Sequence, residues 1–172
     1  MSIVTETGAG LSNGETYASV VAFKAYCDAR GVSYAAFTDA QLEQFLRKAA
    51  DYIGETYRTR WCGYRVTETQ ALDWPRSLAA KPDQLGSVGI RYYLTTEIPA
   101  EVIRAQNEMT IRASAGDDLT ADTTQTIKRE KVGAIETEYA EHSRAGTAYL
   151  AVDRLLALLL SRSGASVMLR RS

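Results

Sequence analysis

The chain has 172 residues, of which 45% are apolar and 24% charged, a balance that excludes an intrinsically disordered protein. A chain of this length can bury about two-thirds of its unfolded surface, so the sequence predicts one domain with a single core. The chain has 20 basic and 21 acidic residues, which gives a formal net charge of −1. This excludes a general electrostatic attraction to nucleic acid or to anionic membranes, so any contact with DNA would be local.

Arginine supplies 15 of the 20 basic side chains. Its planar guanidinium group suits fixed, bidentate contacts, so this bias favours a protein with extensive interfaces. The two cysteines, Cys27 and Cys62, are 35 positions apart, without a CxxC motif or a signal-like N-terminus. We therefore expect no disulfide framework and no zinc site, in a protein made in a reducing cytosol.

The first elements are an N-terminal arm over residues 1–15 and a helix over residues 17–30. The arm contains three glycines without a following Lys-Ser/Thr pair, which predicts a flexible arm or a turn rather than a phosphate-binding loop. Thr16 can cap the helix and Gly31 can close it. The expected apolar side of this helix consists of Tyr17, Val20, Val21, Phe23 and Cys27.

The next helix is the most clearly marked, because Thr38 and Gln41 form a capping-box pair ahead of an apolar repeat. We predict that it spans residues 39–57, with a buried face made of Leu42, Phe45, Leu46, Ala49 and Ile53. Glycines and prolines then interrupt residues 58–99, which predicts irregular structure with short strands. An irregular segment of this length is usually functional or held in place by something else.

A third helix is predicted from Pro99 to Gly116, with Glu101 in its first turn. Its core side chains are expected to be Val102, Ile103 and Met109, with Ala105, Ile111 and Ala113 as further candidates. Residues 127–139 follow a polar loop. Their pattern of charged and β-branched residues predicts an extended strand or an irregular hairpin, with a helix or a loop as the alternatives.

The last predicted helix covers residues 148–162 and is apolar nearly all round. Its apolar core is shorter than the roughly 20 residues that cross a bilayer, so it is expected to be buried in protein. We favour a central core helix over one that also packs against a neighbouring subunit. The remaining tail, residues 165–172, would suit a groove or a sheet edge, through Val167, Met168, Leu169, Arg170 and Arg171.

No arrangement of residues indicates catalysis. His142 is the only histidine and lies in a polar segment, which is typical of a solvated loop residue. Asp117, Asp118 and Asp122 do not match a calcium loop, and an acidic turn is the better interpretation. We therefore expect a protein that is not an enzyme and that has no cofactor and no metal.

A local cluster of arginines and aromatic residues allows a nucleic-acid hypothesis. Basic side chains interleaved with aromatic rings can follow a single strand while the bases stack on the rings. The same rings can equally form a small core of their own beneath snorkelling arginines, and on this acidic chain we favour packing. The cluster consists of Arg58, Arg60, Arg65 and Arg76 among Tyr57, Trp61, Tyr64 and Trp74.

Several stretches resemble one family of small phage proteins. They are TYASV at 16–20, WCGYR at 61–65 leading into QALDWPR at 70–76, and IPAEV at 98–102 with Ala105. Residues 132–139 and AVDRLL at 151–156 are similar in the same order. The family is that of the head-to-tail adaptors, also called connectors or head-completion proteins, of tailed bacteriophages. Some of its members carry the label "DnaT-like single-stranded-DNA-binding".

The resemblance implies a mainly α fold: a bundle of about four helices with a long irregular loop, a short β element and extended terminal arms. Residues 1–164 would form this single adaptor domain. It implies a homo-oligomeric ring, commonly of about twelve copies, at the head-tail junction of the virion. The ring would bind the portal protein on one side and a tail or stopper protein on the other. Genomic DNA would pass through without sequence-specific binding, and no membrane would be involved. Single-stranded-DNA binding in replication is the alternative.

Two segments are candidates for contact with these partners. Residues 167–171 of the tail are expected to dock into the portal. In the loop, Trp61 and Trp74 are expected to anchor the chain, while Pro75 restricts the residues before it and Arg76 projects outward in a set direction. The loop would then be either only an anchor or also a partner contact.

Overall fold

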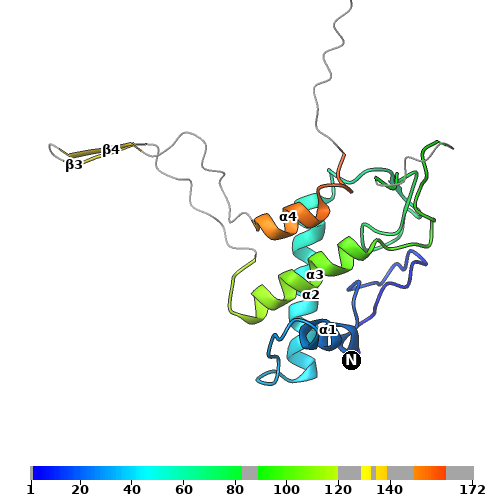
Figure 1. The fold of residues 1–172 in the computed structure, drawn as a ribbon, viewed down its shortest axis with the longest axis horizontal. Coiled ribbons are helices and arrows are strands. Elements are labelled where there is room, and N and C mark those ends of the chain that lie inside the picture. Colours follow the sequence, from blue (N-terminus) through cyan, green and yellow to red (C-terminus); the bar gives the residue numbers. More distant parts are fainter. Residues whose placement is uncertain (1, 83–88, 120–128, 133–134, 139–148, 162–172) are drawn as a thin grey trace, which may run out of the picture.

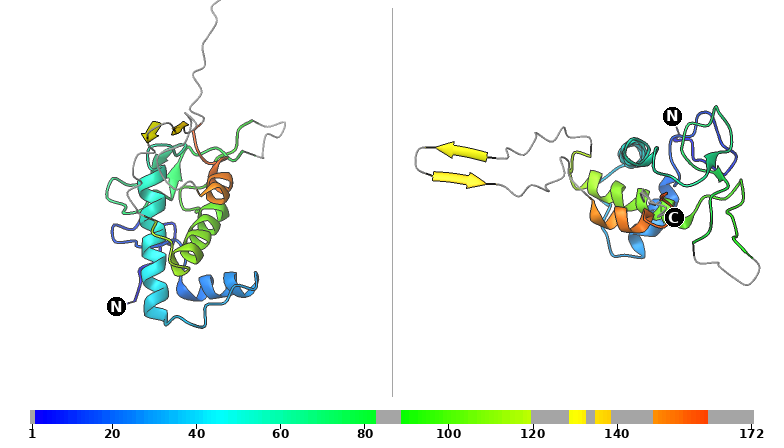
Figure 2. Two further views of the ribbon diagram at one scale, coloured as in Figure 1. Left: turned by 90° about the vertical axis from the view of Figure 1, so that its left-hand side faces the viewer. Right: turned by 90° about the horizontal axis from the view of Figure 1, so that it is seen from above.

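The computed structural model describes residues 2–82, 89–119, 129–132, 135–138 and 149–161. Two helices, α3 and α4, lie across the long helix α2, and α1 lies near the start of α2 (Figures 1 and 2). The prediction of a mainly helical small domain is confirmed. The elements are α1 (Val20–Asp28), α2 (Asp39–Tyr57), β1 (Tyr64–Arg65), β2 (Arg76–Ser77), α3 (Ala100–Ser114), β3 (Arg129–Val132), β4 (Ile135–Glu138) and α4 (Leu150–Leu156).

Helix α2 is the central element, and both its bounds and its capping box are as predicted. The Thr38 hydroxyl accepts from the Gln41 amide at 3.4 Å, and the Gln41 side chain accepts from the Thr38 amide at 2.9 Å. Four of the five predicted core residues are completely buried, whereas Phe45 is half-buried. The buried face also includes Ala50 and Tyr57, because α3 packs along this side of the helix.

Helix α1 begins three residues later than expected, at Val20, with Ser19 as its N-cap. The reason is the buried side chain of Gln106 on α3, which accepts from the Tyr17 amide at 2.8 Å and donates to the Thr16 hydroxyl. Residues 16 and 17 are therefore bound to α3 and do not form the first turn of α1. Phe23 and Cys27 are buried as predicted, but Val21 is 78% exposed, so its assignment to the apolar side is wrong.

Helix α3 follows the prediction, with Pro99 at its N-cap and Gly116 just beyond its end, at a φ of 97°. Helix α4 is shorter than predicted, because the chain leaves the helix after Leu156 and pairs with the segment that follows α2. The Cys62 amide donates to the Leu159 carbonyl at 3.0 Å. Leu150 and Leu158 are 54% and 55% exposed, so the expectation of a helix buried nearly all round is wrong.

The long loop after α2 is irregular with short strands, as predicted. Its middle part, residues 76–81, pairs on one side with β1 and on the other with residues 91–93. Gly63 lies against the backbone of residues 77–79. A Cβ atom there would stand 2.3 Å from the Ser77 carbonyl oxygen, and φ is 69°, so glycine is required.

The glycine-rich start forms a turn packed on the domain rather than an arm that extends from it. The buried Glu6 carboxylate accepts from the amides of Gly8, Gly10 and Leu11, at 2.7–3.0 Å. The Ala71 amide then donates to the Leu11 carbonyl at 2.9 Å. Because Glu6 already occupies these amides, the turn offers no cradle for a phosphate.

Strands β3 and β4 confirm the hairpin alternative for residues 127–139, with Arg129 opposite Glu138 and Val132 opposite Ile135. Figures 1 and 2 show this hairpin apart from the four helices. His142, Asp122 and the tail residues Val167, Met168, Leu169, Arg170 and Arg171 lie outside the described residues. Within the described ranges, no helix has the length and apolarity to cross a bilayer, and no group of three His, Cys, Asp or Glu is placed to hold a metal.

An acid-dependent contact joins the N-terminal turn to α2. One Glu15 oxygen accepts from Arg47 Nε at 2.8 Å and the other from the Val4 amide at 2.9 Å, and these bonds hold the pKa of Glu15 below its usual value. A carboxyl with a lowered pKa stabilises the fold above its unfolded-state pKa, and this contribution is lost as the pH falls through the folded-state value.

We therefore expect Glu15→Gln to flatten the decline in melting temperature between pH 5 and pH 3, measured by circular dichroism. Asp51→Asn is the control of opposite sign. Burial, with the nearby Glu55 and Glu15 charges, raises the pKa of Asp51, so its ionisation opposes folding as the pH rises. An unchanged acid profile for Glu15→Gln would contradict the assignment.

Candidate functional site

The QALDWPR segment at residues 70–76 turns its large side chains into the domain. Trp74 is completely buried, and its ring meets the Trp61 ring edge-on at 6.0 Å and the Tyr93 ring at 5.6 Å. Trp61 in turn contacts Tyr57 on α2 at 5.9 Å. A continuous series of four rings therefore ties the loop to the core.

Arg76 also lies inside the fold, which corrects the expectation that it projects outward. Its side chain is 7% exposed and donates to the carbonyls of Cys62, Asp73 and Gly63 at 2.8, 3.1 and 2.6 Å. Burial lowers the pKa of this guanidinium, with the charge of Asp73 acting in the opposite direction. The sequence could not reveal this position, because two of the three carbonyls, those of Cys62 and Gly63, come from the segment before β1, more than ten residues away.

Asp73 is the centre of a second set of contacts. Its buried carboxylate accepts from Arg58 Nε and from Trp61 Nε1, both at 3.1 Å. The amides of Asp73 and Trp74 donate to the Tyr17 hydroxyl at 3.0 and 3.2 Å. Burial raises the pKa of this tyrosine well above its usual value. The Trp74–Pro75 peptide bond is cis.

Gln70, the first residue of the segment, is 2% exposed. Its side-chain amide donates to the carbonyls of Leu72 and Pro75 and accepts from the Thr67 amide, at 2.8, 3.1 and 3.0 Å. The polar residues of the segment are therefore engaged in holding the loop. In this structure, the characteristic side chains of the QALDWPR segment make contacts within the domain.

The other arginines of the predicted nucleic-acid cluster have internal partners too. Arg65 donates to the carbonyls of Gln70 and Glu68, and the Arg60 guanidinium lies over the Tyr57 ring at 5.3 Å from its centre. Of the four aromatic residues in the cluster, only Tyr64 is exposed, at 70%. The three buried rings are not accessible to bases, which leaves Tyr64 as the one ring of this cluster on which a base could stack.

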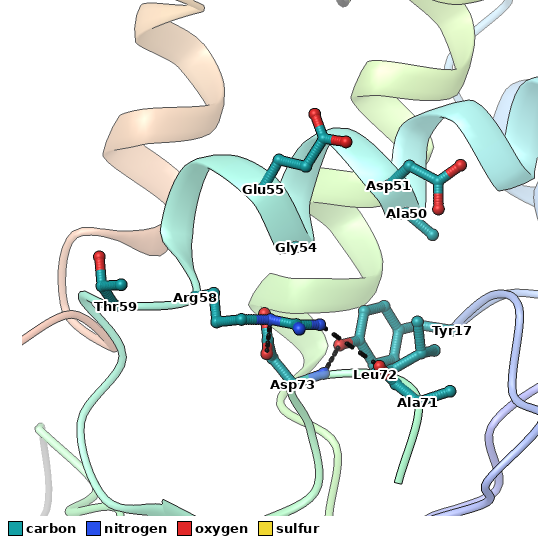
Figure 3. A pocket seen from close by; sticks show the side chains of 10 residues that line it. All are labelled: Tyr17, Ala50, Asp51, Gly54, Glu55, Arg58, Thr59, Ala71, Leu72 and Asp73. Carbon is teal, nitrogen blue, oxygen red and sulfur yellow. Dashed lines mark hydrogen bonds and ion pairs between the residues drawn. The ribbon is translucent and has the colours of Figure 1, made fainter.

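A pocket of about 400 Å³ opens beside this network, between the second half of α2 and the strip of chain at residues 71–73. Figure 3 shows the Arg58 side chain reaching from the end of α2 across to Asp73, with the Tyr17 hydroxyl next to it. Asp51 and Glu55 stand on α2 one turn apart at the rim. The other lining residues are Ala50, Gly54, Thr59, Ala71 and Leu72.

The charge of this pocket is negative. Arg58 is engaged by the buried Asp73, whereas neither Asp51 nor Glu55 has an ion pair among the described residues. Burial and the neighbouring Glu55 and Glu15 charges raise the pKa of Asp51. The arrangement disfavours phosphate and suits a cationic or apolar side chain.

Sequence reasoning did not identify this pocket. The spacing of Asp51 and Glu55 on the outer side of the predicted helix was the only available signal. The opposing wall comes from residues 71–73, and nothing in the sequence indicates that it folds back beside α2. The tail residues assigned to portal binding lie outside the described part of the chain, so the structure does not relate them to the pocket.

Comparisons with known proteins give one family. No curated protein and no solved structure matches the chain. A family model described as "Putative DnaT-like ssDNA binding protein" matches residues 1–172. Because this match covers the whole length, the chain belongs to the DnaT-like family.

Proposed function

We propose that this protein is a structural component of a phage virion, a head-to-tail adaptor. In this proposal, copies of the chain form a ring between the portal protein and a tail or stopper protein. Genomic DNA passes through the ring, and residues 165–172 dock into the portal. The resemblance of residues 16–20, 61–76 and 98–105 to adaptors suggests this role, which needs neither a cofactor nor an active site.

The observation that carries the proposal is the internal use of the arginine and aromatic cluster. Arg58 donates to the Asp73 carboxylate, and Arg65 and Arg76 donate to backbone carbonyls of the same loop. Side chains arranged this way build a rigid loop and leave few donors for phosphates. A rigid loop suits a subunit that must hold neighbours in a fixed geometry.

The charge distribution also favours an adaptor. A channel that made many phosphate contacts would impede the passage of DNA, because each contact adds to the affinity. The chain has a net charge of −1, and the pocket beside α2 is lined by Asp51 and Glu55, neither of which has an ion pair within the described ranges of the chain. Weak attraction to DNA is what an open passage requires.

The test is capture of the purified chain by the portal protein encoded in the same genome, followed by mass photometry. We expect the full chain to bind as a ring, and a chain ending at Gly164 to keep its melting temperature but lose portal binding, because deletion of the tail removes no described core residue. Unaltered binding of the shortened chain would contradict the docking role of the tail. Absence of portal binding by the full chain would contradict the adaptor function.

Single-stranded-DNA binding is the second candidate, and the family description favours it. The same preparation can be titrated with labelled single strands at several salt concentrations. A DNA-binding protein would lose affinity with salt at a slope of about 0.7 for each phosphate contact. Tight, salt-sensitive binding without affinity for the portal would establish this function in place of the adaptor.

A further inference from the structure

The hairpin of β3 and β4 forms a sheet of its own. Among the described strands, β3 and β4 pair only with each other, and Figures 1 and 2 show them apart from the four helices. A two-stranded hairpin by itself is marginally stable in water. Each of its outer edges also presents backbone N–H and C=O groups with which a further strand can pair. Addition of such a strand would therefore stabilise the hairpin.

The register of the hairpin sorts its charged residues into two columns on one face. Arg129 lies opposite Glu138, and Lys131 lies opposite Glu136. Directly opposite residues of an antiparallel pair share a face, and so do alternate residues of one strand. These four residues therefore share one face of the hairpin. We call the two on β3 the basic column and the two on β4 the acidic column. The other face holds Glu130, Val132, Ile135 and Thr137.

The two columns determine which edges of two hairpins can meet. Pairing of β3 with the β3 of another copy would bring two basic columns together, and pairing of β4 with β4 would do the same for two acidic columns. Like charges on neighbouring strands are destabilising. Pairing of β3 with the β4 of another copy places a basic column beside an acidic one, so that the sign alternates from strand to strand. The charges therefore favour a head-to-tail contact over a symmetric one.

We propose that β3 of one copy pairs with β4 of the next copy, so that the hairpins of a ring join into one continuous sheet. This inference rests on the proposed ring and names a contact that closes it. Two different edges that meet head to tail form a heterologous interface, which repeats around an axis into a ring. Rotation about an axis along the strands makes the new pairs antiparallel, like the pair within each hairpin. Closure of the sheet leaves no free edge.

The first test reverses one column and measures self-association of the full chain by sedimentation velocity. We expect concentration-dependent association of the wild type. The double variant Arg129→Glu, Lys131→Glu should weaken it at least tenfold, because both columns are then acidic. Arg104→Glu, Arg154→Glu is the matched control, since it changes the net charge equally at exposed positions of α3 and α4. A wild type that stays monomeric, or equal weakening by the control, would overturn the inference.

The second test exchanges the two columns and identifies which edges meet. The exchanged chain carries Glu136→Lys and Glu138→Lys in addition to the reversed β3 column. It should associate like the wild type, because every head-to-tail contact again joins opposite charges. In a mixture of the two chains, each labelled with its own fluorophore, we expect no co-assembly, because every mixed head-to-tail contact joins like charges. Preferential co-assembly would reveal a symmetric contact, and failure of the exchanged chain to associate would exclude pairing through these columns. Either result would overturn the inference.

These outcomes separate the inference from the function that it deepens. Self-association that follows the signs of the two columns, without any portal binding, would support this contact and contradict the adaptor. Portal binding by a ring that is insensitive to the reversal of the β3 column would support the adaptor and contradict this contact.

Discussion

Replacing Trp74 by alanine is expected to lower the free energy of unfolding by about 3–5 kcal/mol. The ring is completely buried between Trp61 and Tyr93, so its removal leaves a cavity at the point where the loop joins the core. In a domain of this size the melting temperature is expected to fall by roughly 10 °C. Chemical denaturation followed by circular dichroism measures the change directly.

Tyr64→Ala is the matched control for this prediction. Tyr64 belongs to the same loop but is 70% exposed, so we expect a change within about 0.5 kcal/mol. Similar, small effects for Trp74→Ala and Tyr64→Ala would mean that the loop does not anchor on the core in solution.

Arg76→Ala is expected to destabilise the protein by about 2–4 kcal/mol, because a buried acceptor left without its donor costs about 1–3 kcal/mol. The substitution removes the donors to Cys62, Asp73 and Gly63 together, and it leaves a space under β2. Arg76→Lys should recover only part of the loss, since one ammonium group cannot match the geometry of the guanidinium fork. Equilibrium urea unfolding of the three proteins gives the comparison.

Arg91→Ala provides the contrast, since Arg91 is exposed and has no ion pair among the described residues. Its effect on the unfolding free energy of the monomer should stay within about 0.5 kcal/mol. If Arg76→Ala were as mild as Arg91→Ala, Arg76 would be a surface residue, as the sequence alone had suggested.

The candidate site was only partly predictable. The sequence singled out Trp61, Trp74, Pro75 and Arg76, and these residues do lie together. It did not show that Arg76 points inward, because a side chain that caps distant carbonyls leaves no local pattern. The acidic pocket was equally hidden, since one wall is a helix and the other is a strip of loop that only tertiary contacts bring beside it.

The sequence by itself determined the elements whose signals are local. The capping box of Thr38 and Gln41 set the start of α2, Pro99 and Gly116 set the ends of α3, and the turn residues set the irregular loop. Only the tertiary structure decided the rest. Gln106 on α3 delayed the start of α1, and pairing of residues 159–161 with the chain after α2 ended α4. Such contacts join residues about 90–100 positions apart, so their energy appears only once the chain has folded.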